Sequence, residues 1–154
     1  MAEIVERVKV QAQRLKDLEK NFDELRLEAI ENSIDSILSQ AENFNGTKII
    51  CHTFQATEMD FLRRVSDLIK LKEKSSIIVL GGKSKEGASI LIAVTDDLVQ
   101  KGIKANEMIK DMAALINGQG GGRPQLAQAG SKEVNKVENA VSQANRLIKE
   151  KIHL

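Results

Sequence analysis

The sequence predicts an α/β fold, in which a long N-terminal helical segment precedes a globular domain with a small mixed β-sheet packed by helices. Three observations support this prediction. Residues 1–44 contain neither glycine nor proline and repeat apolar residues at helical spacing. From residue 47 onward, short runs of β-branched and aliphatic residues alternate with amphipathic segments. Aromatic residues make up only 3% of the 154-residue chain, so its core must be aliphatic.

The helical segment, residues 1–45, carries a heptad seam. Apolar residues follow a three–four spacing from Ile4 to Ala29, and Gln11 is the one polar residue in the seam. The helix therefore either packs on its own domain or pairs with another chain as a coiled coil, which would make a homodimer.

A second apolar run, from Ile30 to Phe44, is offset by one residue from the first. Because Asn32-Ser33 lies near the offset, the helix is either continuous or broken there. Asn45-Gly46 is expected to end the helix, since both residues readily adopt the left-handed conformation of a helix C-cap.

The globular domain, residues 46–154, is expected to combine strands and helices. In chain order we expect a strand at 47–53, a helix at 57–74, strands at 77–80 and 88–94, helices at 96–102 and 105–117, a loop or short strand at 126–129 and a helix at 131–152. The run 77–80 is continuously apolar, as in a strand buried on both faces, and residues 81–87 would form the turn that follows it. Thr57 and Ser131 are the expected N-caps of their helices.

Composition and charge exclude several classes of protein. A single cysteine rules out an internal disulfide and suits the cytoplasm, and no apolar stretch approaches the roughly 20 residues that a membrane span needs. Residues 1–46 hold six basic and ten acidic residues, a net charge of −4. Residues 47–154 hold 17 basic and 12 acidic residues, a net charge of +5, which permits contact with a polyanion.

The sequence lacks the usual signatures of catalysis. Cys51 and His52 are neighbours on an expected strand, so their side chains point to opposite faces and cannot form a dyad. His52 and His153 offer no metal-ligand spacing. The segment 81–84 has a Gly-Gly-Lys-Ser sequence but lacks the earlier glycine of a phosphate-binding loop. We therefore expect no cofactor and no metal, and the chain alone is not expected to be an enzyme.

Contact with nucleic acid is the remaining possibility. The basic candidates are Arg63, Arg64, Lys83, Lys85, Arg123 and Lys132. Each such residue is more often an ordinary solvated charge than a phosphate ligand. Arg123 differs because it follows Gly120, Gly121 and Gly122, which predict a loop whose N–H groups can cradle an anion beside a guanidinium. The alternative is that the three glycines let this segment pack tightly. The four phenylalanines all occupy apolar-patterned positions, so we expect recognition of backbone and shape without base stacking.

The segment 118–130 reads Gly-Gln-Gly-Gly-Gly-Arg-Pro-Gln-Leu-Ala-Gln-Ala-Gly. It resembles the glycine-rich signature near the C-terminus of bacterial alanyl-tRNA synthetases, and the expected elements of residues 46–154 follow in family order. The resemblance implies a DHH-associated domain, with Gln128 and the glycines among its nucleic-acid contacts. Four positions depart from the family pattern of Gly, Lys, Asp and Gly: Asn117, Gln119, Gln125 and Ser131. Loss of the lysine weakens a phosphate contact, and loss of the aspartate removes a partner for Arg123.

The resemblance leaves three hypotheses open. The favoured one is a domain that binds the outer corner of tRNA, presumed to be alanine tRNA, and serves the catalytic and editing domains of a larger cytoplasmic synthetase. The second is a dimerisation module that has lost RNA binding, in which the coiled coil is the function. The dimer seam itself is residues 4–29, the sheet edge, or neither. The third is an accessory domain of a DHH-type phosphoesterase.

Overall fold

The computed structural model describes residues 1–55 and 57–152, and it divides into two compact units, Met1–Ile34 and Asp35–Leu154. Helix α1, Ala2–Ser39, supplies all of the first unit except Met1, and it continues into the start of the second. The expected alternative of a break near Asn32-Ser33 is wrong, because the helix is continuous. The Ser33 hydroxyl donates to the Ala29 carbonyl, one turn back, at 2.7 Å. This hydrogen bond satisfies the polar side chain without interrupting the helix.

The end of the first helix differs from the sequence prediction. The helix ends at Ser39, and a short strand β1, Glu42–Phe44, follows it. Asn45 and Gly46 have φ of 53° and 83°, and they join β1 to β2, Thr47–Phe54, as a two-residue hairpin. Two successive left-handed residues are what a tight hairpin turn requires, so Asn45-Gly46 is a strand turn and not a helix cap.

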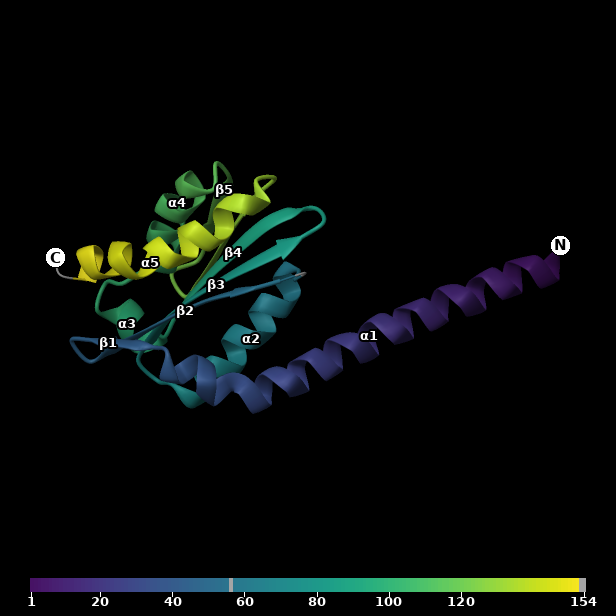
Figure 1. Cartoon of the computed structure of the whole chain (residues 1–154), viewed down its shortest axis with the longest axis horizontal. Coiled ribbons are helices and arrows are strands. Elements are labelled where there is room, and N and C mark those ends of the chain that lie inside the picture. Colours follow the sequence, from purple (N-terminus) through teal and green to yellow (C-terminus); the bar gives the residue numbers. More distant parts are fainter. Residues whose placement is uncertain (56, 153–154) are drawn as a thin grey trace. The chain divides into compact units, whose positions relative to one another are not determined.

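One mixed sheet of six strands forms the centre of the second unit (Figure 1). Its order is β1-β2-β3-β4-β6-β5, with β3 at Ser76–Ser84, β4 at Gly87–Val94, β5 at Gln119–Gly122 and β6 at Leu126–Ser131. Strands β2 and β3 are parallel and the other neighbours are antiparallel. This confirms the predicted α/β fold with a small mixed sheet.

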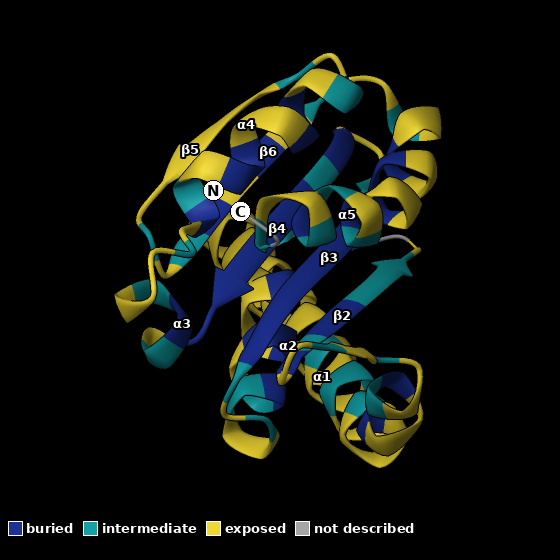
Figure 2. Ribbon diagram, turned by 90° about the vertical axis from the view of Figure 1, so that its left-hand side faces the viewer, coloured by how far each residue is buried: buried dark blue, intermediate teal, exposed yellow. Residues whose placement is uncertain are grey.

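Helices cover the two faces of the sheet unequally (Figures 1 and 2). Helices α4, Ala105–Leu115, and α5, Val137–Ile152, pack on one face in an aliphatic cluster with Ile49, Val79 and Ile92. Helix α2, Met59–Lys72, lies on the other face, where Leu62 would meet a Cβ placed on Gly82. A short α3, Asp96–Gln100, follows β4. Helix α2 packs mainly against β3 and β4. On its side of the sheet the outer strands stay open, since Gln128 and Gly130 of β6 and all four residues of β5 are exposed.

The core has the aliphatic character that the composition predicts. Ile77, Ile78, Val79 and Leu80 are all fully buried, which confirms a strand covered on both faces. None of the described helices combines the length and the apolar character that a bilayer span needs.

Several local expectations are wrong. Thr57 does not cap α2, because Glu58 takes that position and the Thr57 hydroxyl donates to the Gln55 carbonyl at 2.7 Å. Residues 81–84 belong to β3 and not to a turn, since they pair with the start of β4. The Ser131 hydroxyl donates to the Ile116 carbonyl at 2.6 Å and accepts the Glu133 N–H, and α5 begins only after a 3₁₀ turn at Val134–Lys136.

Candidate nucleic-acid interface

The glycine-rich segment forms the outer edge of the sheet. Gly120, Gly121 and Gly122 lie in β5, so the expected loop is in fact an edge strand paired with β6. All four β5 residues are exposed (Figure 2). The Arg123 N–H donates to the Leu126 carbonyl at 2.9 Å, and the Leu126 N–H donates back at 3.2 Å. These two bonds close the hairpin and hold β5 against β6.

The hydrogen-bond pattern gives the outer edge of β5 a definite polarity. Arg123 and Leu126 exchange both of their hydrogen bonds. Because pairs alternate along an antiparallel ladder, the N–H and C=O groups of Gly122 and Gly120 point away from β6. The edge beside Arg123 therefore presents backbone donors that the sheet does not use.

The three glycines differ in what a larger side chain would meet at each position. A Cβ on Gly120 would lie 2.7 Å from the Cβ of Ala129, and one on Gly122 would lie 2.6 Å from the Cα of Ala127. Gly122 also has a φ of 155°. By contrast, a Cβ on Gly121 would meet nothing within 4 Å. Two of the glycines are thus required by packing against β6, whereas Gly121 faces open space.

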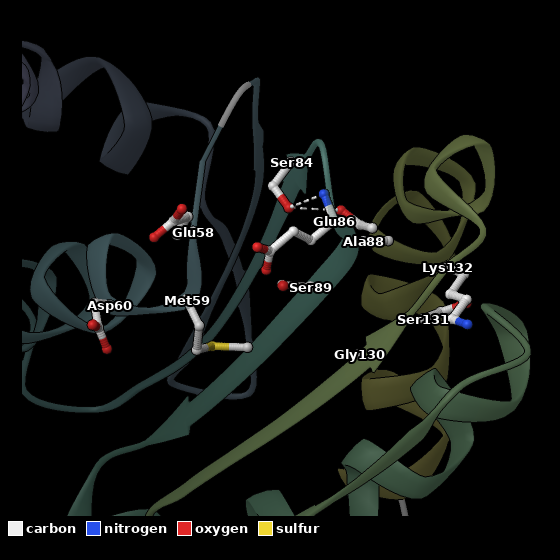
Figure 3. A pocket seen from close by; sticks show the side chains of 11 residues that line it. Glu58, Met59, Asp60, Ser84, Glu86, Ala88, Ser89, Gly130, Ser131 and Lys132 are labelled. Atoms are coloured by element: carbon white, nitrogen blue, oxygen red, sulfur yellow. Dashed lines mark hydrogen bonds between the residues drawn. The ribbon is translucent and has the colours of Figure 1, made fainter.

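Two adjoining hollows lie on the open part of the sheet, and Met59, Ser89 and Gly130 line both of them. The first, of about 520 Å³, is bordered by the start of α2 and the β3–β4 turn (Figure 3). We call the second, of about 480 Å³, the Gly121 hollow. Its lining residues are Met59, Ser89, Gln119, Gly120, Gly121, Gln128, Ala129 and Gly130.

The two hollows differ in the charge of the residues that line them. Glu58, Asp60 and Glu86 border the first hollow, and Lys132 is its one basic lining residue (Figure 3). None of the described residues that line the Gly121 hollow is ionisable. The first hollow is therefore unsuited to a phosphate, because three carboxylates against one ammonium repel an anion.

Arg63 connects helix α2 to strand β6 across the open face of the sheet. One of its guanidinium nitrogens donates to the side-chain oxygen of Gln128 at 2.5 Å, and another reaches Asp60 at 3.4 Å. Arg63 and Gln128 are 65 positions apart in the chain. The contact with Gln128 brings two predicted site residues together beside the Gly121 hollow. The positive charge of Arg63 is partly paired with Asp60.

The other predicted site residues are spread over the domain. Lys83 points to the opposite face of the sheet and pairs with Glu138 of α5 at 2.6 Å. This contact, with a second donor from Gln55, lowers the pKa of the Glu138 carboxyl. Among the predicted basic residues, Arg64, Lys85, Arg123 and Lys132 are exposed and make no ion pair or side-chain hydrogen bond in the described part of the chain. Of the predicted site residues that the structure describes, Gly120, Gly121 and Gln128 line one hollow, and Arg63 contacts Gln128 beside it.

The residues considered for catalysis lie apart. The Cys51 side chain packs toward α4 and α5, where burial raises the pKa of its thiol to about 12. His52 contacts Phe54 edge-on, with ring centroids 4.6 Å apart, and burial lowers the pKa of its imidazole. His153 lies outside the described residues. Within the described ranges, no three His, Cys, Asp or Glu side chains cluster as metal ligands would.

Comparison with known proteins identifies the family. The DHHA1 domain matches residues 46–150. This range holds strands β2 to β6 and helices α2 to α5, except for the last two residues of α5. The chain belongs to the DHHA1 domain family. This domain is similar to the solved C-Ala domain from Aquifex aeolicus alanyl-tRNA synthetase, with a TM-score of 0.62 and 27% identity. The match covers 72% of this chain and 96% of that one.

Curated relatives give the same family over nearly the full chain. An alanine–tRNA ligase of Alkaliphilus metalliredigens is 35% identical over 151 residues, which is 98% of this chain and 17% of that protein. An alanine–tRNA ligase of Acetivibrio thermocellus is 34% identical over 148 residues, again 17% of its length. The chain therefore spans about a sixth of the relatives that it matches. The resemblance based on residues 118–130 is confirmed.

Sequence reasoning missed the residues that shape the two hollows. Met59 and Asp60 lie in the first turn of α2, and Ser89 faces the hollows from β4. Ser89 could have been recognised, because it is the one polar side chain in an otherwise apolar buried strand. Asp60 and Met59 carried no such signal, since their role depends on where α2 crosses the sheet.

Proposed function

We propose that this DHHA1 domain is a tRNA-binding C-terminal domain of an alanine–tRNA ligase, which contacts the outer corner of tRNA through backbone and shape. The observation that carries the proposal is the exposed glycine hairpin within a fold that aligns with nearly the whole C-Ala domain. Its partners would be alanine tRNA and the catalytic and editing domains of the same cytoplasmic enzyme, whose aminoacylation and editing it would assist.

The surface chemistry is consistent with weak, phosphate-directed binding. Arg64, Arg123 and Lys132 are exposed and have no ion pair in the described residues. The outer N–H groups of Gly120 and Gly122 add neutral donors next to Arg123. Because the three phenylalanines of the second unit are half-buried or buried, stacking of bases on aromatic rings has no platform there.

Titration of labelled alanine tRNA at two salt concentrations tests this function. If three phosphates are neutralised, affinity should fall about 40-fold between roughly 50 and 200 mM salt, because the salt slope is about 0.9 per phosphate. A labelled acidic protein of about the same size as the tRNA serves as the control for binding to any polyanion. Binding that is absent at low salt, or equal at both salt concentrations, would argue against tRNA recognition and leave the DHH-type phosphoesterase alternative to be examined.

Self-association through α1 is a second proposed function. The heptad seam residues of the first unit are between 59% and 66% exposed: Ile4, Val8, Leu15, Leu18, Phe22 and Leu25. An apolar stripe of this length, interrupted in the seam only by Gln11, favours pairing with a second copy of the helix. Sedimentation of the whole chain and of a version that begins at Ala29 tests it. A dimer for the whole chain and a monomer for the shorter version are expected, and monomers for both would rule out a coiled coil.

A further inference from the structure

The Gly121 hollow has the chemistry of an uncharged ligand. Its eight lining residues contribute amides, a hydroxyl, a thioether and backbone, with no ionisable group. Figure 3 shows the Met59 side chain extending from α2 toward β4, where it can give an apolar contact to a flat group. A phosphate would gain no counter-charge from these lining residues, because the neighbouring Arg63 already contacts Gln128 and Asp60. It would also lie beside the carboxylates of the first hollow.

The contact with Arg63 fixes which way the Gln128 amide faces. A guanidinium has only donors, so the amide oxygen of Gln128 must turn toward Arg63. The amide nitrogen then points elsewhere, and it has no acceptor among the described residues. Asp60 holds Arg63 from the other side at 3.4 Å. Gln128 therefore offers two hydrogen-bond donors to whatever occupies the hollow.

Gly121 keeps this space open. A Cβ there would meet nothing within 4 Å, so packing against β6 does not require a glycine at this position. Its side-chain direction is that of Gln128, its partner across the ladder. A larger side chain at position 121 would project into the hollow without displacing the core.

We propose that the Gly121 hollow is a nucleoside subsite, which takes an uncharged base or ribose edge of the bound RNA while the phosphates lie outside it. The proposal rests on the proposed tRNA binding and names the part of the RNA that meets this surface. Gln128 donates to a carbonyl oxygen or ring nitrogen of the base, Met59 contacts its apolar face, and Arg63 positions Gln128. The phosphates of the same strand lie at the outer edge of β5, beside Arg123.

The salt dependence of binding distinguishes a nucleoside subsite from a phosphate site. Loss of a neutral contact lowers affinity by the same factor at every salt concentration. Loss of a phosphate contact also makes the plot of log K against log salt shallower by about 0.7 to 0.9. The probe is labelled alanine tRNA, and the variants are Gln128→Leu and Gly121→Leu, with Gln100→Leu on exposed α3 as the matched control.

We expect Gln128→Leu to weaken binding about five- to tenfold, the range of one or two hydrogen bonds, with an unchanged salt slope. Gly121→Leu should weaken binding by about as much because its side chain fills the hollow, again with an unchanged slope. Gln100→Leu should bind like the parent chain. If Gly121→Leu does not fold, Gln128→Leu decides alone, since Gln128 is exposed. Unchanged affinity, or a slope shallower by about 0.7 or more, would overturn the subsite while the parent still binds. Failure of the parent chain to bind would overturn the proposed function and the subsite with it.

Discussion

Gly120 and Ala129 face each other across β5 and β6 so closely that a Cβ on Gly120 would lie 2.7 Å from that of Ala129. The neighbouring Gly121 points to the other face and meets nothing within 4 Å. One run of glycines therefore serves two purposes. Gly120 and Gly122 let an edge strand pack closely on β6, and Gly121 leaves room above the sheet for another molecule.

Alanine substitutions should separate these two purposes. Gly120→Ala should lower the free energy of unfolding by about 1–3 kcal/mol, because the added methyl group must displace Ala129 or the β6 backbone. Gly121→Ala should change it by about 0.5 kcal/mol or less. Urea denaturation of both variants and the parent measures the difference. Equal destabilisation by the two substitutions would show that the hairpin, and not the individual contact, limits side-chain size.

Cys51 should be chemically silent in the folded protein. Burial raises the pKa of its thiol to about 12, so only about one molecule in ten thousand carries a thiolate at pH 8. Labelling with a disulfide reagent should therefore be at least about 100-fold slower in native buffer than in denaturant, where the thiol regains its ordinary pKa. Rapid labelling of the native chain would mean that β2 is open to solvent on its α5 side.

Much of the fold could be predicted because its signals are local. The buried strand at 77–80 and the helices α4 and α5 follow from apolar runs and periodicity. Asn45-Gly46 was misassigned because the same dipeptide suits a helix end and a hairpin turn, and only pairing of Phe44 with Thr47 decides between them. The three glycines were expected in a loop, because strand propensity cannot show that β6 accepts so close a partner.

The candidate site was less predictable than the fold. Arg63 and Gln128 were both named from the sequence, but their contact across 65 positions depends on how α2 crosses the sheet. Lys83 was also named, and it lies on the opposite face because strand residues alternate and β3 extends further than its apolar run indicated. The sequence thus identified the glycine segment, whereas the contact of Arg63 with Gln128 depends on where α2 crosses the sheet.

Glu42 should make stability depend on acid pH. Lys149 and Asn145 of α5 donate to its carboxylate, and these contacts hold the pKa of Glu42 below its usual value of 4.5. A carboxyl whose pKa is lower in the folded state stabilises the fold above its unfolded pKa, and this contribution is lost as pH falls through the folded pKa. Glu42→Gln should therefore lower the urea midpoint at pH 7, and the difference from the parent should shrink below about pH 4.5.

The control for Glu42 is Glu86→Gln, a change in an exposed carboxyl of the β3–β4 turn that makes no ion pair in the described residues. It should leave the urea midpoint close to that of the parent at both pH values. If Glu42→Gln differs from the parent equally at pH 7 and at pH 3.5, the contact acts through hydrogen bonding and not through charge.

Arg123→Ala should weaken tRNA binding without weakening the fold. The Arg123 side chain is exposed and has no partner among the described residues, and its backbone hydrogen bonds with Leu126 are available to alanine as well. The free energy of unfolding should therefore change by about 0.5 kcal/mol or less. A charge-assisted contact to phosphate is worth about 1.5–3 kcal/mol, so affinity should fall roughly 10- to 150-fold.

The salt slope gives Arg123 a signature that differs from that of Gln128. Loss of one phosphate contact should make the slope shallower by about 0.7 to 0.9, whereas Gln128→Leu should leave it unchanged. Lys101→Ala, at an exposed lysine after α3, is the control for the loss of one surface charge. If Arg123→Ala binds tRNA as the control does, the outer edge of β5 is not a phosphate site. If it unfolds the domain instead, Arg123 pins the hairpin and the glycines serve packing alone.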